Sequence, residues 1–247
     1  MSKATVHPIV YDADGLLVIH KPQGVLSHPN PQSKGKSSVH CAFEGSYDYE
    51  KRCFQSPEGP IWLIHRLDQD TSGILIAART AKTALECRLQ FDEGHIKKHY
   101  HALCVGRVSP EKGTWKDMII TIRQGGSVRS KVVPSPAPNA ELRYRIEKFF
   151  PYDGLSWMAV ELMTGKTHQI RIQTSYRRHP VLGDQVYGNF SLNKQLKKEM
   201  GLDRLCLHAS RIDMKHPSKR NEILKLEAPL PQDLQDILKT LSSRVVR

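Results

Sequence analysis

The sequence has few acidic residues and lacks the features that identify several large classes of protein. It contains 25 Asp and Glu residues against 37 Lys and Arg, so its formal net charge is +12. No apolar run approaches the roughly 18 residues that a membrane-spanning helix requires. The beginning of the chain shows no signal-peptide pattern. These absences predict a cytoplasmic protein with no membrane partner.

Cysteine is also scarce, and its spacing is irregular. The five cysteines form no C-x-x-C pair, which argues against a zinc module and against a disulfide framework. No G-x-S-x-G sequence is present to form a nucleophile elbow. Two segments, GKS at 35–37 and GKT at 165–167, resemble the end of a phosphate-binding loop, but the required earlier glycine is Asn30 in one case and Val160 in the other. A nucleotide hydrolase therefore has no support from the motifs.

The excess of positive charge predicts a polyanionic partner, and nucleic acid is the commonest one. Hydrophobic residues make up 39% of the 247 residues, which is enough to form a core and too many for a disordered chain. The alternative interpretation is that the charge serves solubility alone, because net charge carries no information about fold.

The hydrophobic pattern predicts more strands than helices. Runs of apolar and β-branched residues indicate strands at 16–20, 72–78, 99–108, 141–149, 156–163, 205–214 and 222–227. These strands do not alternate regularly with helices, so we predict an α+β fold with a mixed, mainly antiparallel sheet and flanking helices and loops. No linker clearly divides the chain, and residues 1–247 are expected to form a single domain.

The first predicted helix follows the 72–78 strand. Thr80 is expected to cap it, and the helix should run to about Phe91. Ala81, Leu85 and Leu89 are spaced to lie on one face of this helix.

Two further helices and two loops complete the pattern. Thr167 is expected to open a helix with the sequence HQIRIQTSYRR, and the apolar spacing after Leu230 predicts a C-terminal helix. Residues 29–60 are rich in Ser, Pro, Gly and Lys and are predicted as a loop with one short helix. Residues 121–140 are predicted as a basic loop rich in Gly and Pro.

The stretch IHRLDQDTSGILIAA, at 64–78, joins two halves of different character. Residues 72–78 are small and apolar, as in a buried strand, whereas Arg66, Asp68 and Asp70 come just before them. Charged side chains are rarely buried without a partner. We therefore expect these charges to face a site at the mouth of the strand.

Asp68 has two interpretations at this stage. A lone Asp at the mouth of a strand is usually a cap or a turn former. An Asp that pairs with an arginine stays ionised in low-dielectric surroundings and can act as a nucleophile or a general base. Arg171, at the end of TGKTHQIR (164–171), is a candidate for that partner.

At this point the sequence resembles a known family, the pseudouridine synthases of the RluA type, which modify ribosomal and transfer RNA. The segment HRLDQDTSG (65–73) is similar to the catalytic motif of that family. The other similar segments follow in the family's order and are VIHKPQGVLSHP (18–29), KKHYHALCVG (97–106), TGKTHQIR (164–171), HPVLGDQVYG (179–188), LHAS (207–210) and LEAPLP (226–231). Two positions depart from the family pattern, since His20 stands where Asn is usual and Lys166 where Arg is usual.

The resemblance implies an isomerase that uses no cofactor and no metal, with a central active-site cleft. Asp68 would be the nucleophile that attacks the uridine, most simply at the anomeric carbon, and Arg171 would pair with it. Tyr100 would lie against the target uracil and Ile170 would line the pocket beneath it. Arg66 would fill the space left when the target nucleotide flips out of its stack.

The resemblance also implies that Lys21, His65 and Lys166 bind the substrate, an rRNA or tRNA stem-loop. A monomer with no obligatory protein partner is expected. Many relatives carry an additional N-terminal RNA-binding domain, and we expect none here because about 15 residues precede the first predicted strand. RNA binding would then come from the catalytic domain, including the 121–140 loop and the surface around Lys97 and Lys98.

Alternatives stay open at several of these positions. Ile170 could be an ordinary core residue and Tyr100 an ordinary strand aromatic, and the 121–140 loop could be a solvated surface turn. A non-catalytic RNA-binding protein that retains the synthase fold is the rival function. The presence of Asp68, Tyr100 and Arg171 together favours the enzyme.

Overall fold

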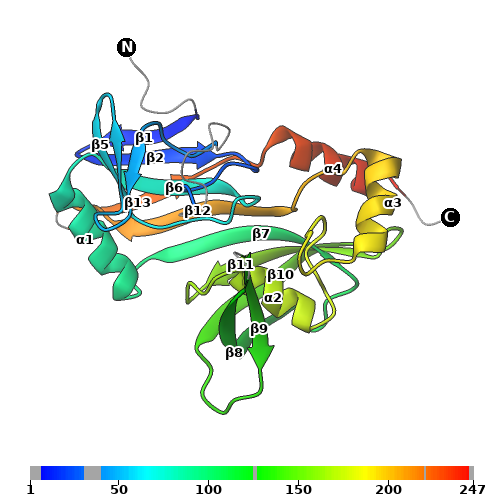
Figure 1. Cartoon of the computed structure of the whole chain (residues 1–247). Coiled ribbons are helices and arrows are strands. Elements are labelled where there is room, and N and C mark those ends of the chain that lie inside the picture. The colour runs from blue at the N-terminus through cyan, green and yellow to red at the C-terminus, as the bar shows by residue number, and fades with distance from the viewer. Residues whose placement is uncertain (1–6, 31–39, 125–126, 220, 245–247) are drawn as a thin grey trace. The chain divides into compact units, whose positions relative to one another are not determined.

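The computed structural model describes residues 7–30, 40–124, 127–219 and 221–244. Within these residues the chain forms thirteen strands and four helices (Figure 1). In the same residues, no helix is long and apolar enough to cross a membrane.

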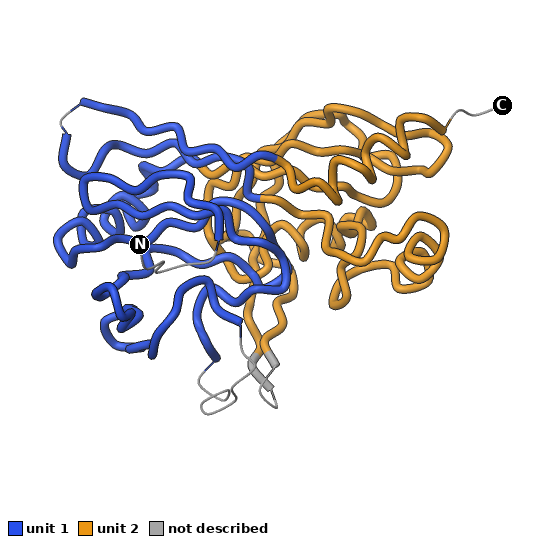
Figure 2. Tube along the Cα trace, turned by 90° about the horizontal axis from the view of Figure 1, so that it is seen from above, with its two compact units in different colours: residues 1–97, 209–229 blue, residues 98–208, 230–247 orange. Residues whose placement is uncertain are grey.

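The chain divides into two compact units, which Figure 2 shows in different colours. Unit 1 contains residues 1–97 and 209–229, and unit 2 contains residues 98–208 and 230–247. Each unit has its own cluster of buried apolar side chains. The predicted α+β class is confirmed, and the pairings whose register is described are antiparallel.

Unit 1 is built around β6 (Ser72–Ala78), in which all seven residues are buried. From Gly73 to Ala78 this strand pairs with β2 (Leu16–Lys21), and the buried apolar residues 16–19 lie opposite 75–78. The other strands of the unit are β1 (Ile9–Ala13), β3 (Ser46–Asp48), β4 (Cys53–Ser56), β5 (Gly59–Leu63), β13 (Ile223–Glu227) and the part of β12 (Leu207–Lys215) that follows His208.

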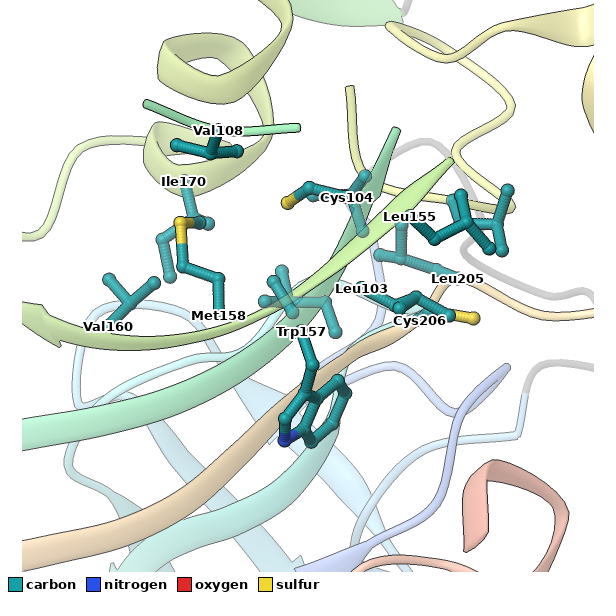
Figure 3. Close-up of a cluster of buried hydrophobic side chains, with 14 of the residues drawn as sticks. Leu103, Cys104, Val108, Leu155, Trp157, Met158, Val160, Ile170, Leu205 and Cys206 are labelled. Carbon is teal, nitrogen blue, oxygen red and sulfur yellow. The ribbon is translucent and has the colours of Figure 1, made fainter. Parts of the chain in front are cut away.

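Unit 2 contains five strands in the order β7-β11-β10-β8-β9. Their bounds are Lys97–Val105 for β7, Lys112–Gln124 for β8, Ser127–Val133 for β9, Ala140–Phe150 for β10 and Leu155–Leu162 for β11. Figure 3 shows the alternation along β11, where Met158 and Val160 point toward Ile170 and Trp157 points to the opposite face. The same cluster holds Cys104 and Cys206, and burial raises the pKa of the Cys206 thiol to about 12. This thiol is therefore unreactive.

Most of the predicted helix ends lie close to the observed ends. Helix α1 (Ala81–Asp92) begins after Thr80, whose side chain accepts a hydrogen bond from the Thr83 amide, and α4 (Gln232–Ser243) buries its apolar stripe. Helix α2 (Gln169–Tyr176) is capped by His168 in a left-handed conformation, so the prediction that Thr167 opens it is wrong by one residue. Helix α3 (Phe190–Met200) was not predicted, although Asn189 caps it through the Leu192 amide.

The face of α1 that carries Ala81, Leu85 and Leu89 is the exposed one. Leu85 and Leu89 are 59% and 44% exposed, whereas Ala84 and Cys87 are buried. The buried stripe is made of small side chains because α1 packs closely on β5 and β6.

Two segments predicted as loops contain strands. Residues 29–60 contain β3, β4 and the start of β5. Residues 121–140 contain the last residues of β8, all of β9 and the first residue of β10. Within these segments, residues 31–39 and 125–126 lie outside the described residues. The Gly and Pro content of residues 121–140 suggested a loop, although the residues of β8 and β9 pair in antiparallel register.

Candidate active site

The segment from His65 to Asp70, which we call the HRLD loop, connects β5 to β6 within unit 1. Asp68 is half-buried, and its carbonyl accepts a hydrogen bond from the Thr71 amide at 3.1 Å, which closes a turn before β6 begins. Gly73 follows in a left-handed conformation (φ 121°), and a side chain there would collide with the backbone of Ala209. Glycine therefore lets β6 approach β12 directly behind the loop.

The side chain of Lys21 holds the HRLD loop from beneath. Lys21 is fully buried, and its ammonium donates to the carbonyls of Pro22, Val25 and Gln69 at 2.8, 2.8 and 2.9 Å. A buried ammonium is stable only when its protons are satisfied, and these bonds supply an acceptor for each proton. Lys21 was predicted to bind the substrate, and a contact with RNA would require the ammonium to leave these acceptors.

Two further side chains fasten the same loop. The buried hydroxyl of Ser27 accepts from the Leu67 amide and donates to the Leu67 carbonyl, both at 2.9 Å. The Gln69 side chain donates to the Gly24 carbonyl at 3.0 Å. The residues on both sides of Asp68 are thus tied to the KPQGVLS segment (21–27). No role was predicted for Ser27 or Gln69, although both lie inside segments that resemble the family.

The other two predicted residues of this loop differ in their surroundings. Arg66 is exposed and forms no ion pair with any residue that the structure describes. His65 accepts a hydrogen bond from the Ile76 amide at its Nε2 atom (3.0 Å), and its ring stacks on Phe91 of α1 with centroids 5.0 Å apart. Arg66 is therefore available to a partner, whereas His65 serves the packing of β6 and α1, and its contact with substrate stays a prediction.

Arg171 lies on α2 in unit 2 and forms a buried ion pair with Asp184. Its Nε and Nη2 atoms donate to the two carboxylate oxygens at 2.7 and 2.9 Å, and the amides of Val186 and Tyr187 donate to the same carboxylate. Burial alone would raise the pKa of the Asp184 carboxyl, but the hydrogen bonds and charge of Arg171, with the two amides, outweigh burial and keep this pKa below its ordinary value.

Asp184 orients the guanidinium of Arg171, and the sequence did not reveal this role. Asp184 does lie in HPVLGDQVYG, a matching segment to which no residue roles were assigned. The predicted pair of Arg171 with Asp68 joins residues of the two units, so it stays a prediction.

Tyr187 connects Arg171 to the β8–β9 hairpin. Its ring lies 5.3 Å from the Arg171 guanidinium, and its hydroxyl accepts from the Ser130 amide of β9 at 2.7 Å. The His168 Nδ1 atom lies 2.9 Å from the same hydroxyl, and the Ser130 side chain donates to the Thr167 carbonyl at 2.9 Å. The hairpin and the start of α2 are therefore fixed together.

The remaining predicted residues are also in unit 2. Tyr100 of β7 is half-buried and packs against the core, and Ile170 is a core residue with 4% of its surface exposed. Lys166 is exposed just before α2, where its amide donates to the Gln169 side chain. An exposed lysine at this place can contact a phosphate, while the roles of Tyr100 and Ile170 toward uracil stay predictions.

Comparisons with known proteins agree on one family. The profile of the RNA pseudouridylate synthase family matches residues 15–176. Ribosomal large subunit pseudouridine synthase C of Vibrio parahaemolyticus is 32% identical over 233 residues, which cover 94% of this chain and 68% of the relative. Ribosomal large subunit pseudouridine synthase D of Nitrosomonas europaea is 32% identical over 235 residues, which cover 94% of this chain and 64% of the relative.

A solved structure supports the same fold. Human RNA Pseudouridylate Synthase Domain Containing 4 superposes with a TM-score of 0.67 at 22% identity, and the match covers 95% of this chain and 93% of the human one. This likeness concerns the arrangement of the backbone.

The tie between Ser27 and Leu67 can be tested by the substitution Ser27→Ala. It leaves the buried amide and carbonyl of Leu67 without a partner, so we expect the free energy of unfolding to fall by about 1–3 kcal/mol. Urea denaturation measures the loss, and Ser46→Ala, at an exposed position of β3, is the matched control. Equal stability of the two variants would show that Ser27 does not hold the loop.

Proposed function

The chain belongs to the RNA pseudouridylate synthase family, and from this premise we propose that it isomerises specific uridines to pseudouridine in a structured RNA, large-subunit rRNA or tRNA. The observation that carries the proposal is the placement of Asp68. Its loop is fixed by Lys21, Ser27 and Gln69 within unit 1, and such a constrained loop presents a reacting group in one geometry.

In the proposed reaction, the Asp68 carboxylate attacks the anomeric carbon of the target uridine. The bond from this carbon to uracil N1 breaks, and the base leaves with the electron pair. The base then rotates, and its carbon 5 bonds to the anomeric carbon as Asp68 departs. Carbon 5 loses its proton and N1 gains one, so the reaction is a balanced isomerisation that requires no oxidant or co-reactant.

The other predicted residues have supporting roles in this proposal. Arg171 would keep Asp68 ionised, and the Asp184 carboxylate supports this role because it fixes the guanidinium in one orientation. Tyr100 would lie against the uracil and take part in proton transfer. Arg66 would occupy the space of the flipped nucleotide, which its exposure and lack of an ion pair allow.

The β8–β9 hairpin is the proposed contact with the RNA backbone. Lys131 pairs with Ile120 and Arg129 pairs with Ile122 across the two strands, so these four side chains share one face, and all are exposed. Ser130 points to the other face and is held by Tyr187 and the carbonyl of Thr167. One face is therefore anchored, and the other presents two cations to a phosphate backbone. A cytoplasmic monomer is part of the same proposal.

The role of Asp68 predicts the effect of Asp68→Asn. An amide cannot act as the nucleophile, so we expect tritium release from RNA labelled at carbon 5 of uridine to be abolished. RNA binding should be retained, because the change is nearly isosteric. Turnover at the wild-type rate would remove Asp68 from this role, and binding without tritium release by the wild-type protein would favour the non-catalytic alternative.

The role of the hairpin predicts a change in salt dependence. The variant Arg129→Gln/Lys131→Gln should bind RNA more weakly, and the slope of log affinity against log salt should become shallower by about 0.7–0.9 for each lost phosphate contact. The matched control is Lys194→Gln/Lys198→Gln on α3, which removes the same charge from exposed positions. Equal slopes in the two variants would contradict the role of the hairpin, because the loss of positive charge would then weaken RNA binding equally at either place on the surface.

A further inference from the structure

Three aromatic side chains of unit 1, His28, Tyr47 and Tyr49, form a group that we call the stacking cluster. The His28 and Tyr47 rings lie nearly parallel, with centroids 5.0 Å apart and an angle of 10° between planes. Tyr49 meets both rings edge-on, at 6.3 Å from His28 and 5.1 Å from Tyr47. All three side chains are half-buried, so the cluster belongs to the surface rather than to the core.

The cluster is fixed in place from within. The Pro29 carbonyl lies 2.9 Å from the His28 Nδ1 atom and accepts from the Tyr49 hydroxyl at 3.0 Å. Because a carbonyl only accepts, His28 carries its proton on Nδ1, and its Nε2 atom is left as an acceptor. Tyr47 is held by Phe54 of β4, whose ring centroid is 4.8 Å away. These rings therefore offer a partner a rigid surface.

The stacking cluster is joined to the HRLD loop through one residue. Ser27, which binds the amide and the carbonyl of Leu67, directly precedes His28. Leu67 lies between Arg66 and Asp68. A movement of the HRLD loop away from Ser27 would therefore break these two bonds.

Positive charge surrounds the cluster. Arg52 and Arg66 act electrostatically on both His28 and Tyr47, and Arg88 also acts on Tyr47. Among the residues that the structure describes, none of these arginines forms an ion pair. Burial, with smaller contributions from Arg66 and Arg52, lowers the pKa of His28, so its ring is neutral at neutral pH. Arg52 donates a hydrogen bond to the Ile64 carbonyl, but it has no carboxylate partner among the described residues. A neutral ring system beside guanidinium groups without carboxylate partners is complementary to a base that carries a phosphate.

We propose that the stacking cluster is a subsite for an unpaired nucleobase that neighbours the target uridine, with Arg52 and Arg66 contacting the adjacent phosphates. Unpaired bases are the parts of a folded RNA that can stack on aromatic side chains. Stacking accepts every base because each base has a flat face, so the subsite would contribute affinity and position the RNA along the surface. The Nε2 acceptor of His28 could distinguish one base from another through a hydrogen bond. The assignment of the partner as substrate RNA rests on the proposed function.

The test uses a short oligouridylate that carries one 2-aminopurine, and the same oligonucleotide with an abasic site in its place. Binding is measured in the Asp68→Asn background so that no turnover changes the RNA. We expect 2-aminopurine fluorescence to be quenched on binding and His28→Ala to reduce both the quenching and the affinity, the latter by roughly 5- to 150-fold. His28→Ala should leave affinity for the abasic oligonucleotide unchanged.

Two further variants separate stacking from folding. His28→Phe retains a ring and should restore the quenching, while Ser46→Ala, at an exposed position of β3 outside the cluster, should match the reference protein. Equal loss of affinity for both oligonucleotides in His28→Ala would overturn the proposal. If His28→Ala does not fold, an absence of quenching in the reference protein overturns the proposal instead.

The outcome is independent of the catalytic claim. The wild-type protein could release tritium while His28→Ala weakens binding of the 2-aminopurine and abasic oligonucleotides equally. That result would remove the subsite and leave the proposed function intact. If His28→Ala weakens binding only when the base is present and the wild-type protein releases no tritium, the nucleobase subsite is retained and the isomerase function is contradicted.

Discussion

The fully buried ammonium of Lys21 is the interaction on which the geometry around Asp68 depends. It lies at the end of β2, opposite Gly73 of β6, and it binds carbonyls from two segments that are far apart in the chain. If the Gln69 carbonyl moved away, a proton of a buried cation would lose its acceptor, which costs several kcal/mol. The position of the loop, and with it the position of Asp68, is thereby coupled to the stability of the unit.

Unit 2 uses the same principle with the opposite sign of charge. The buried carboxylate of Asp184 receives hydrogen bonds from Arg171 and from two backbone amides, so the guanidinium and the turn after Asp184 are fixed by one group. Tyr187 extends this arrangement to the β8–β9 hairpin through Ser130. In both units a buried charge fixes the neighbouring backbone through hydrogen bonds, while Arg66 and Arg129 remain exposed at the surface.

The sequence predicted the buried framework well because burial has a simple pattern. The uninterrupted apolar run of β6 and the Thr80 cap of α1 appear in the structure as expected. The hairpin and the strands after residue 40 were missed, since Gly and Pro suggest loops even where strands continue beside them. Asp68 was singled out by the charges at the mouth of a strand, and its role as the nucleophile stays a prediction.

The residues that hold the site could not be found in this way. The substrate contacts of Lys21 and His65 stay predictions. What the sequence could not show is that the Lys21 ammonium is buried, and only the fold reveals its three carbonyl acceptors. Ser27, Asp184 and Tyr187 act through partners distant in the chain, which spacing along a single sequence does not encode.

The most direct test of this account is the substitution Lys21→Met, examined by single-turnover tritium release at saturating RNA together with the RNA Kd. Because the buried ammonium of Lys21 is bound to three backbone carbonyls, we expect it to position the loop without contacting RNA. The account then predicts that the saturating rate falls by about 100-fold, the cost expected for a misplaced nucleophile, while the Kd is unchanged. A weakened Kd with a wild-type saturating rate would contradict it, since that result requires Lys21 to bind the RNA directly.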